Sequence, residues 1–404
     1  MKIDKSVINT INKKNVLSAI RASGQVFKAE IARSTGLSIP TVMKITDELI
    51  GRGLVKEAGK GESSGGKPPQ LLEFVADRHY IVGVDIGTTN ILCILMDMSA
   101  NILYEHSVPT MVKDAPEQII DRVAATIEAV IAQAGVEQER LLGIGLGMPG
   151  LLDYETGTVL FSPDFHWERV ELLPALKTRF ALPMVVHNVT HSMAMAQKWF
   201  GYGRGDMNSF ICVNLGHGIG SALFLDGELF SGGSGSAGEL GHMTMEKDGP
   251  ICVCGNPGCL EALASGDAIV RRARAEIGVL NDTNIRRKAD EDRLEAKDVF
   301  EAAGLGNETA QRIIADAAEY IGLALAKVVN LLDPEMIVLE GGLSRAGSSF
   351  ITSIHNHAQR YQMKYAGRNT KIVVSELAEY AAAIGSAAFL IKRLFDVGGD
   401  QRAI

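Results

Sequence analysis

Residues 239–261 read Glu239-Leu-Gly-His242-Met-Thr-Met-Glu-Lys-Asp-Gly-Pro-Ile-Cys252-Val-Cys254-Gly-Asn-Pro-Gly-Cys259-Leu-Glu261 and hold three of the five cysteines of the chain. Three thiolates and one imidazole form a donor set that tetrahedral Zn²⁺ prefers. Because four protein ligands leave no position for a reactive water, the sequence predicts a structural Zn²⁺ bound by His242, Cys252, Cys254 and Cys259. The alternative, two buried thiols and an incidental third, explains neither the spacing nor the histidine.

Two carboxylates frame this stretch, one before the histidine and one after the last cysteine. A metal-bound turn would hold Glu239 and Glu261 close to one another. Each carboxylate offers two acceptor oxygens, which suit the hydroxyl groups of a sugar. The sequence therefore predicts that the zinc turn also positions acceptors for a sugar.

Length and composition indicate a globular chain of more than one domain. The chain has 404 residues, of which 46% are hydrophobic and 22% are charged, and two or three domains are expected. No apolar run approaches the roughly 18 residues of a membrane span, and no charged-then-apolar leader is found. We therefore expect a cytoplasmic protein without membrane contact, in which Cys93 and Cys212 are buried thiols.

Charge is distributed unevenly along the chain. Residues 1–60 carry eleven Lys and Arg against five Asp and Glu, a balance of +6, so the remaining residues must carry −14 to give the total of −8. A small basic module joined to an acidic body indicates that only the module binds DNA.

The basic module has the pattern of a helix-turn-helix. Helices are expected at 6–23 and 28–35, with Gly36 supplying the turn. A third helix, capped by Ser38, would run to about residue 52 and enter the major groove with its N-terminal end. Its candidate DNA contacts are Ser38, Pro40, Thr41 and Lys44. The alternative is a three-helix module that binds another protein.

A β-wing is expected after the third helix. Short strands at 54–57 and 71–74 flank a tip rich in Gly, Ser and Lys. A tip without bulky side chains can approach phosphates closely, and Lys60 and Lys67 add positive charge. The alternative is a flexible linker, which the flanking strands argue against. With the helices, the wing makes residues 1–76 the predicted DNA-binding domain.

The segments 238–242 (Gly-Glu-Leu-Gly-His) and 252–261 (Cys-Val-Cys-Gly-Asn-Pro-Gly-Cys-Leu-Glu) resemble the signature of the ROK family of repressors and sugar kinases, and the resemblance covers most of the chain. It implies an α/β protein in which a winged helix-turn-helix precedes a two-lobed actin-like sugar-kinase fold. The first lobe would comprise 77–196 plus 380–404. The second, at 197–379, would carry the zinc site and an oligomerisation surface. Since one helix in one groove reads too few bases, a homodimer or homotetramer is expected.

The resemblance also assigns a sugar site. The family's sugar-contact positions match Asn188, Glu239, His242 and Glu261. The kinases follow the asparagine with an aspartate that takes the proton from the attacking hydroxyl, whereas this chain has Val189. Loss of a general base costs roughly 10²–10⁴-fold in rate. The neighbouring His187 and His191 are expected to point elsewhere.

Two further loops bear on kinase activity. Asp85-Ile-Gly-Thr-Thr resembles the family's first phosphate loop, where the aspartate would bind hydrated magnesium. In the second loop His217 replaces a threonine that would face phosphate. Trp167 ends the segment 162–167, which lies where family members place a sugar-contacting segment, and it would either stack on a sugar or lie in the core.

These features predict a sugar-responsive DNA-binding regulator that is not an enzyme. It would repress genes of carbohydrate uptake or catabolism, with operator DNA and a small sugar or sugar phosphate as its partners. One alternative is an ATP-dependent sugar kinase with a fused DNA-binding module, against which Val189 and His217 argue. Another is a repressor controlled by a partner protein.

Overall fold

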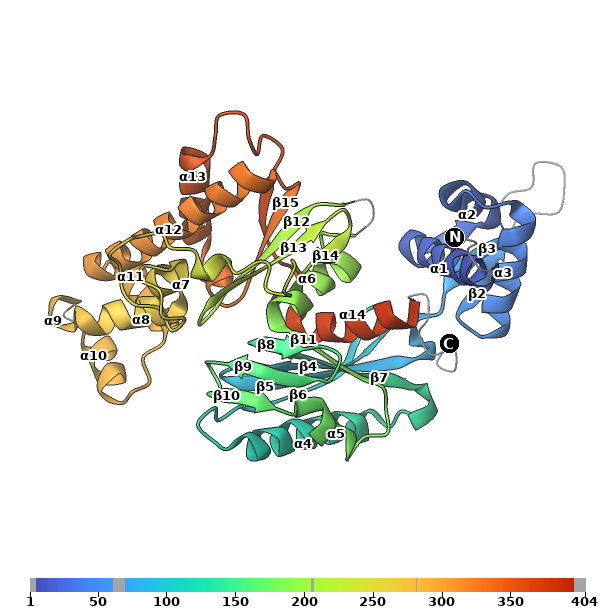
Figure 1. Cartoon of the computed structure of the whole chain (residues 1–404), viewed down its shortest axis with the longest axis horizontal. Helices are drawn as coiled ribbons and strands as arrows, with labels where there is room; N and C mark the ends of the chain where they lie inside the picture. The colour runs from blue at the N-terminus through green and yellow to red at the C-terminus, as the bar shows by residue number, and fades with distance from the viewer. Residues whose placement is uncertain (1–4, 61–69, 205–206, 281, 396–404) are drawn as a thin grey trace. The chain divides into compact units, whose positions relative to one another are not determined.

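The computed structural model describes residues 5–60, 70–204, 207–280 and 282–395 (Figure 1). The chain forms two compact units, Met1–His187 with Ser386–Ile404, and Asn188–Gly385. The first unit contains a helical module with a small sheet, and each unit is built around a five-stranded sheet. The predicted α/β class is therefore confirmed.

The N-terminal module has three helices and a three-stranded antiparallel sheet in the order β1-β3-β2. Its elements are α1 (Lys5–Ser23), β1 (Gln25–Phe27), α2 (Lys28–Thr35), α3 (Ile39–Gly51), β2 (Val55–Lys60) and β3 (Gln70–Phe74). Ile20, Ile31 and Val42 from the three helices are fully buried together with Leu72 of β3. The predicted winged helix-turn-helix is thus present, with β1 as an unforeseen strand. The wing tip at 61–69, including Lys67, lies outside the described residues.

The large sheet of the first unit has the strand order β11-β7-β4-β5-β6. Its strands are β4 (Tyr80–Ile86), β5 (Asn90–Asp97), β6 (Ile102–Pro109), β7 (Leu141–Met148) and β11 (Met184–Asn188). A smaller sheet, which the sequence did not predict, consists of β8 (Leu151–Asp153), β9 (Thr158–Ser162) and β10 (Trp167–Val170). Helices α4 (Pro116–Ala134) and α5 (Leu172–Lys177) complete this lobe.

The C-terminal helix α14 (Ala381–Phe395) returns to the first unit and packs directly on β4 and β7. The Ser386 hydroxyl accepts from the Val84 amide at 3.2 Å and donates to the Gly145 carbonyl at 3.0 Å. A Cβ atom on Gly145 would lie only 2.1 Å from the Ser386 carbonyl oxygen, so this contact requires glycine. From Ser386 onward the last helix is therefore part of the first unit, although the second unit lies between the two segments in sequence.

The sheet of the second unit repeats the pattern of the first in the order β14-β13-β12-β15-β16. In both sheets a three-stranded antiparallel meander is extended from its first strand by later strands. The strands here are β12 (Phe210–Leu215), β13 (Ile219–Leu225), β14 (Glu228–Phe230), β15 (Met336–Glu340) and β16 (Lys371–Val374). This repetition is the duplicated architecture expected of an actin-like fold.

Helices surround this second sheet, and several short ones were not predicted. They are α6 (Val189–Phe200), α7 (Leu260–Ala264), α8 (Gly266–Ala275), α9 (Ile277–Leu280), α10 (Thr283–Asp290), α11 (Ala296–Gly304), α12 (Glu308–Leu332) and α13 (Ser348–Tyr361). α8 ends at Ala275, before the separate turn of α9.

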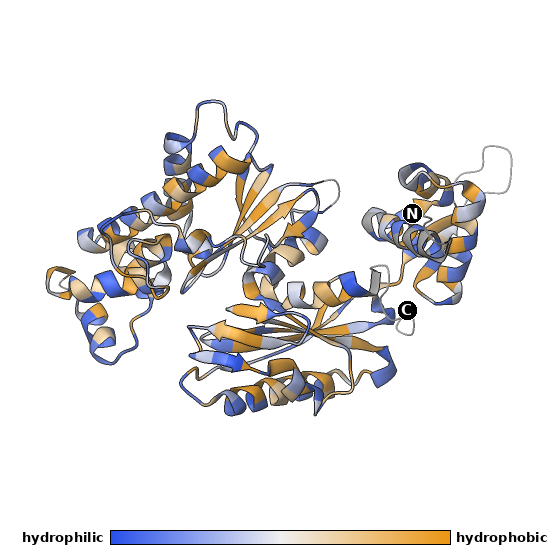
Figure 2. Ribbon diagram, in the orientation of Figure 1, coloured by the Kyte–Doolittle hydropathy of each residue, from blue (hydrophilic) through white to orange (hydrophobic). Residues whose placement is uncertain are grey.

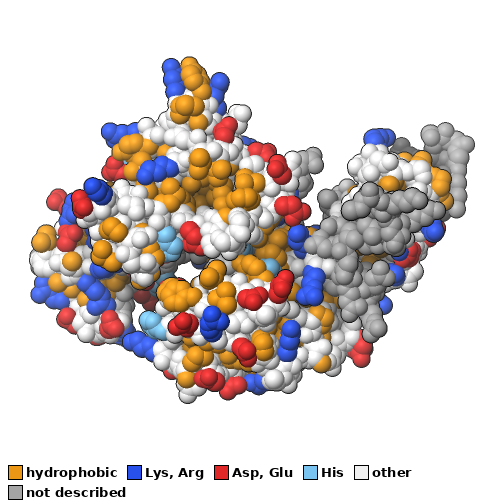
Figure 3. Space-filling view, in the orientation of Figure 1, with side chains coloured by type: hydrophobic (Ala, Val, Ile, Leu, Met, Phe, Trp, Pro, Cys, Tyr) orange, Lys and Arg blue, Asp and Glu red, His pale blue; other side chains and the backbone are white. Residues whose placement is uncertain are grey.

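Hydrophobic residues gather in the strands of both large sheets (Figure 2). β7 is buried along its whole length and β4 at all but one residue, as expected for strands covered on both faces. Charged side chains of both signs are interspersed on the face shown in Figure 3. Among the described residues, no helix has the length and apolar character needed to cross a membrane.

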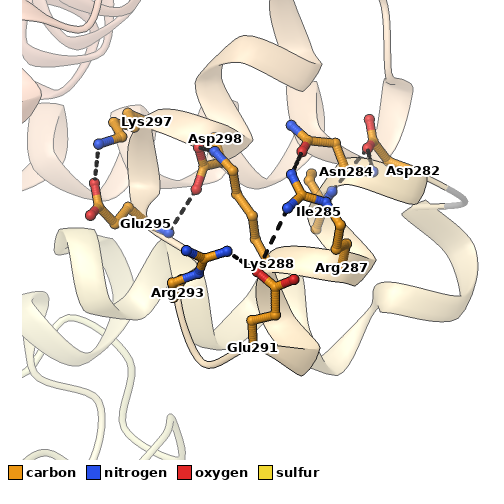
Figure 4. Close-up of polar contacts among 10 residues, drawn as sticks. All are labelled: Asp282, Asn284, Ile285, Arg287, Lys288, Glu291, Arg293, Glu295, Lys297 and Asp298. Carbon is orange, nitrogen blue, oxygen red and sulfur yellow. Dashed lines mark hydrogen bonds and ion pairs between the residues drawn. The ribbon is translucent and has the colours of Figure 1, made fainter.

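A polar network attaches α10 to α11 (Figure 4). The Lys288 Nζ atom lies 2.5 Å from Oδ1 of Asp298, whose side chain is only 2% exposed. Oδ2 of Asp298 accepts from the Glu295 amide and thereby caps α11. The nearby pair Lys297–Glu295 is largely exposed.

Lys288→Met is expected to lower the free energy of unfolding by about 1–3 kcal/mol, because it leaves a buried carboxylate without its cation. The matched variant Lys297→Met removes only a solvent-exposed partner and should cost about 0–1 kcal/mol. Urea unfolding of both variants measures the difference. An equal loss of unfolding free energy in the two variants would show that the buried Lys288–Asp298 pair contributes no more than the exposed pair.

Candidate metal centre and ligand site

The four predicted metal ligands converge in the second unit. The ligand atoms of His242, Cys252, Cys254 and Cys259 all lie within 4.8 Å of one another. The Cys252 sulfur is 3.6 Å from Nδ1 of His242, and the Cys254 and Cys259 sulfurs are also 3.6 Å apart. A tetrahedral ion with Zn–S of about 2.3 Å and Zn–N of about 2.1 Å separates its donors by roughly 3.6–3.8 Å. The residues present therefore fit Zn²⁺.

Tight turns bring the three sulfurs together. The Cys252 amide donates to the Asn256 carbonyl at 2.9 Å, and the Gly258 amide donates to the Pro250 carbonyl at 2.9 Å. Gly258 has φ +64°, and a Cβ there would lie 1.6 Å from the Glu246 carbonyl oxygen. Burial raises the pKa of the Cys252 thiol to about 12, so a bound cation is needed to hold it as a thiolate.

The position of His242 depends on a close contact with the start of β13. It ends the 3₁₀ turn η3 (Leu240–His242), whose Gly241 lies so close to β13 that a Cβ would be 1.9 Å from the Ile219 carbonyl oxygen. With Nδ1 facing the sulfurs, Nε2 lies 3.8 Å from Oε2 of Glu239. The imidazole thus stands between the metal cluster and an exposed carboxylate, as the predicted double role of this histidine requires.

Glu261 has a structural contact that the sequence did not reveal. Its Oε2 atom accepts from the Ile219 amide at 2.9 Å, and its Oε1 atom lies 3.8 Å from the Cys252 sulfur. A Cβ on Gly218 would be 2.4 Å from Oε2, so the loop before β13 presses directly on this carboxylate. Glu261 therefore connects the metal turn to the start of β13.

Asn188 precedes α6 and is its N-cap residue. Its Oδ1 atom caps α6 by accepting from the amides of Thr190 at 2.8 Å and His191 at 3.4 Å. Thr190 packs against Gly220, where a Cβ would be 2.6 Å from the threonine hydroxyl. Thr190 of α6 and Glu261 therefore both contact the start of β13, at Gly220 and at Ile219.

Two histidines lie close in sequence to Val189, which the family resemblance matches to the kinase base position. His191 is buried, and this burial lowers its pKa to about 4. The His187 ring stacks on Phe389 at a centroid distance of 3.4 Å and on Tyr154 at 4.7 Å. The His187 imidazole thus stacks on two aromatic rings, whereas the His191 imidazole is buried.

The second phosphate loop carries an acidic group that sequence inspection missed. His217 Nδ1 lies 2.9 Å from Oδ1 of Asp267, in the first turn of α8. The Asp267 amide also donates to the His217 carbonyl at 3.2 Å. A carboxylate beside this loop would repel a phosphate group. The sequence contained a signal for this contact, because Ser265-Gly266-Asp267 is typical of a helix start and follows the metal turn closely.

Burial argues against the predicted ligand roles of two other residues, Trp167 and Asp85. Trp167 is 2% exposed and packs edge-on against Phe165 at 5.2 Å, so it is a core residue and does not stack on a sugar. Oδ1 of Asp85 is buried with no hydrogen-bond partner among the described residues. Burial raises the pKa of Asp85 to about 7, which weakens it as a ligand for magnesium.

The candidate DNA-binding surface is the N-terminal end of α3. The Ser38 hydroxyl accepts from the Thr41 amide at 3.4 Å and lies 2.8 Å from the Thr41 hydroxyl, so these two residues cap the helix. Pro40 and Lys44 are exposed. Ile39 and Met43, one helical turn apart, are 51% and 46% exposed and were missed, although their spacing places them away from the core. Such apolar groups can contact thymine methyls.

Comparison with known proteins identifies the family. The ROK family model matches residues 81–393, and the chain belongs to this family. It is 31% identical to the xylose repressor of Caldicellulosiruptor bescii over 96% of each chain. It is 32% identical to a glucokinase of Thermotoga maritima, over 78% of this chain and 98% of the kinase.

Solved structures give the same relationship. A crystal structure of a ROK-family transcriptional regulator, a homologue of the Escherichia coli MLC protein, matches with a TM-score of 0.79 and 26% identity, over 96% of this chain and 97% of that chain. A ROK glucokinase from Streptomyces griseus, solved with glucose and AMPPNP, covers 78% of this chain with a TM-score of 0.68 and 30% identity. The regulators therefore match nearly the whole chain, whereas the kinases match about four-fifths of it.

Proposed function

We propose that the chain is a sugar-responsive transcriptional repressor whose kinase-like body binds a sugar or sugar phosphate without phosphorylating it. The observation that carries the proposal is Val189, which follows the capping Asn188 where the kinases have their base. The likeness to a xylose repressor over 96% of the chain supports control of carbohydrate uptake or catabolism genes.

The parts have distinct roles in this proposal. Residues 1–76 bind operator DNA, 77–196 with 380–404 form the first lobe, and 197–379 form the second lobe with the zinc site and the surface for a homodimer or homotetramer. Zn²⁺ is structural, because its four ligands fill a tetrahedral shell and hold His242 and Glu261 in place. Asn188, Glu239, His242 and Glu261 accept from and donate to sugar hydroxyls.

The test is release from DNA by a sugar. A duplex bound tightly by the purified full chain is selected from random DNA, and its affinity is measured by fluorescence anisotropy with D-xylose, D-glucose and N-acetylglucosamine. At least one sugar should raise both the melting temperature and the Kd for DNA. A chain that binds no duplex specifically would contradict the proposal.

Glu239→Ala is expected to weaken binding of the active sugar by about 1–3 kcal/mol, because hydroxyls would lose a charged acceptor. Glu239 has a 62% exposed side chain, so folding should be preserved. Asp248→Ala, an exposed acid on the same turn, is the control and should leave affinity unchanged. Isothermal titration measures both, and full sugar-dependent release by Glu239→Ala would rule out this site.

Lys44→Ala is expected to weaken operator binding. It should also reduce the slope of log K against log salt concentration by about 1, the value for one lost phosphate contact. The same prediction holds for Lys67→Ala on the wing. Lys113→Ala, outside the DNA-binding domain, is the control. Unchanged affinity and salt slope in both variants would place the DNA-binding surface elsewhere.

A further inference from the structure

The linker between the winged module and the first lobe, residues 75–79, is held from both sides. On the module side, the Val75 amide donates at 3.0 Å to the carbonyl of Leu54, just beyond α3. The Arg78 side chain lies against Gly53, where a Cβ would be 3.3 Å from Arg78 Nε. The turn that follows the recognition helix therefore contacts the linker directly.

On the lobe side, one guanidinium holds two linker carbonyls. Arg140 Nε donates to the Arg78 carbonyl at 3.2 Å, and Nη2 donates to the Asp77 carbonyl at 2.5 Å. Nη2 also lies 3.2 Å from the Tyr80 hydroxyl, and the guanidinium carbon is 4.8 Å from the centroid of the Tyr80 ring. The Met98 amide adds a bond to the Ala76 carbonyl at 3.1 Å. Only arginine has a planar fork of donors for such a set of acceptors.

Arg140 is also adjacent in sequence to a strand that leads to the loops of the first lobe. It ends the turn η2 (Gln138–Arg140) and immediately precedes β7. β7 and β4 pair in parallel from Tyr80↔Leu141 to Asp85↔Gly147. Both strands therefore start at the linker, and β4 ends at the predicted phosphate loop that begins with Asp85. A buried strand of this length, about 20–25 Å, moves as a stiff unit.

We propose that Arg140 is a positioning residue that couples the first lobe to the recognition helix. A change at the far ends of β4 and β7 moves their near ends, and Arg140 passes this movement to Asp77 and Arg78 and so to the turn after α3. This inference rests on the proposed function, because it concerns how the sugar signal reaches DNA. A residue with only a structural role would alter stability and leave the coupling intact.

The first experiment needs no sugar and no DNA. Trypsin cleaves after Arg78 only when the linker opens, and Arg140 holds the carbonyl of that bond. In Arg140→Met, cleavage after Arg78, followed by mass spectrometry, should be at least about tenfold faster, because two hydrogen bonds are lost. Arg140→Lys should be intermediate. Arg179→Met is the control, since its guanidinium pairs with Asp121 and Glu128 on the lobe surface. An unchanged cleavage rate in Arg140→Met would show that the Arg140 hydrogen bonds to the Asp77 and Arg78 carbonyls, here called the clamp, do not hold the linker closed.

The second experiment measures coupling in the full chain with the sugar selected from D-xylose, D-glucose and N-acetylglucosamine. Arg140→Met should bind operator and sugar separately with affinities within about threefold of wild type, while the sugar-induced change in operator Kd falls to less than about twofold. Arg140→Lys should recover part of the coupling, and Arg179→Met should retain all of it. Full coupling in Arg140→Met would overturn the proposal. If wild type shows no sugar response, the proposed function fails, whereas the trypsin result still decides whether the clamp exists.

Discussion

Cys254→Ser is expected to release the metal and to loosen the turn at 249–261, η3 and α7 together. A serine hydroxyl does not ionise near neutral pH, so the ion loses one of its four ligands. Cys252 lies 3.6 Å from His242 Nδ1 and 3.8 Å from Glu261 Oε1, so both predicted sugar residues lose their anchor with the ion. Sugar affinity should fall by roughly 10–100-fold.

Elemental analysis checks this result, with about one zinc per chain expected in wild type and little in the variant. Hydrogen exchange should rise across 240–264 in the variant. Cys93→Ala is the control, because Cys93 is a buried thiol of the first unit and should leave the ion in place. A metal-free wild-type chain that is fully folded would contradict the zinc centre.

The wild-type chain is expected to show no significant phosphoryl transfer with ATP, magnesium and a panel of sugars. Kinases turn over at about 1–100 per second, and the missing base lowers the rate by roughly 10²–10⁴-fold. Val189→Asp alone should restore little activity, because the second phosphate loop still carries His217 beside Asp267. The triple variant Val189→Asp, His217→Thr, Asp267→Asn removes both obstacles and should be the more active of the two.

Coupled ADP release measures these rates, and binding of AMPPNP measures nucleotide affinity separately. His217→Thr with Asp267→Asn should improve AMPPNP binding without improving turnover, because the base is still absent. Turnover by wild type at ordinary kinase rates would overturn the repressor proposal and favour the sugar kinase with a fused DNA-binding module.

Local signals in the sequence determined much of this protein. Turn glycines, caps and apolar spacing act over a few residues, so α2, α3 and the ligands of the metal turn could be located from the sequence. Val189 and His217 were recognised in another way, as departures from the pattern of the ROK kinases that the chain resembles. The short elements β8, β9, β10 and α10 were missed, because they are stabilised by contacts with the rest of their lobe and have weak patterns of their own.

Only the tertiary structure decided which partner each side chain finds. Trp167 was ambiguous in sequence because an indole suits both a core and a sugar, and its burial beside Phe165 came from the packing of β9 and β10. Glu261 meets the Ile219 amide, His217 meets Asp267, and Arg140 meets Asp77 across 42, 50 and 63 residues. Contacts over such separations depend on sheet order and close backbone packing, which no local pattern encodes, whereas the ligands of the metal turn lie within one short segment whose turns fix them.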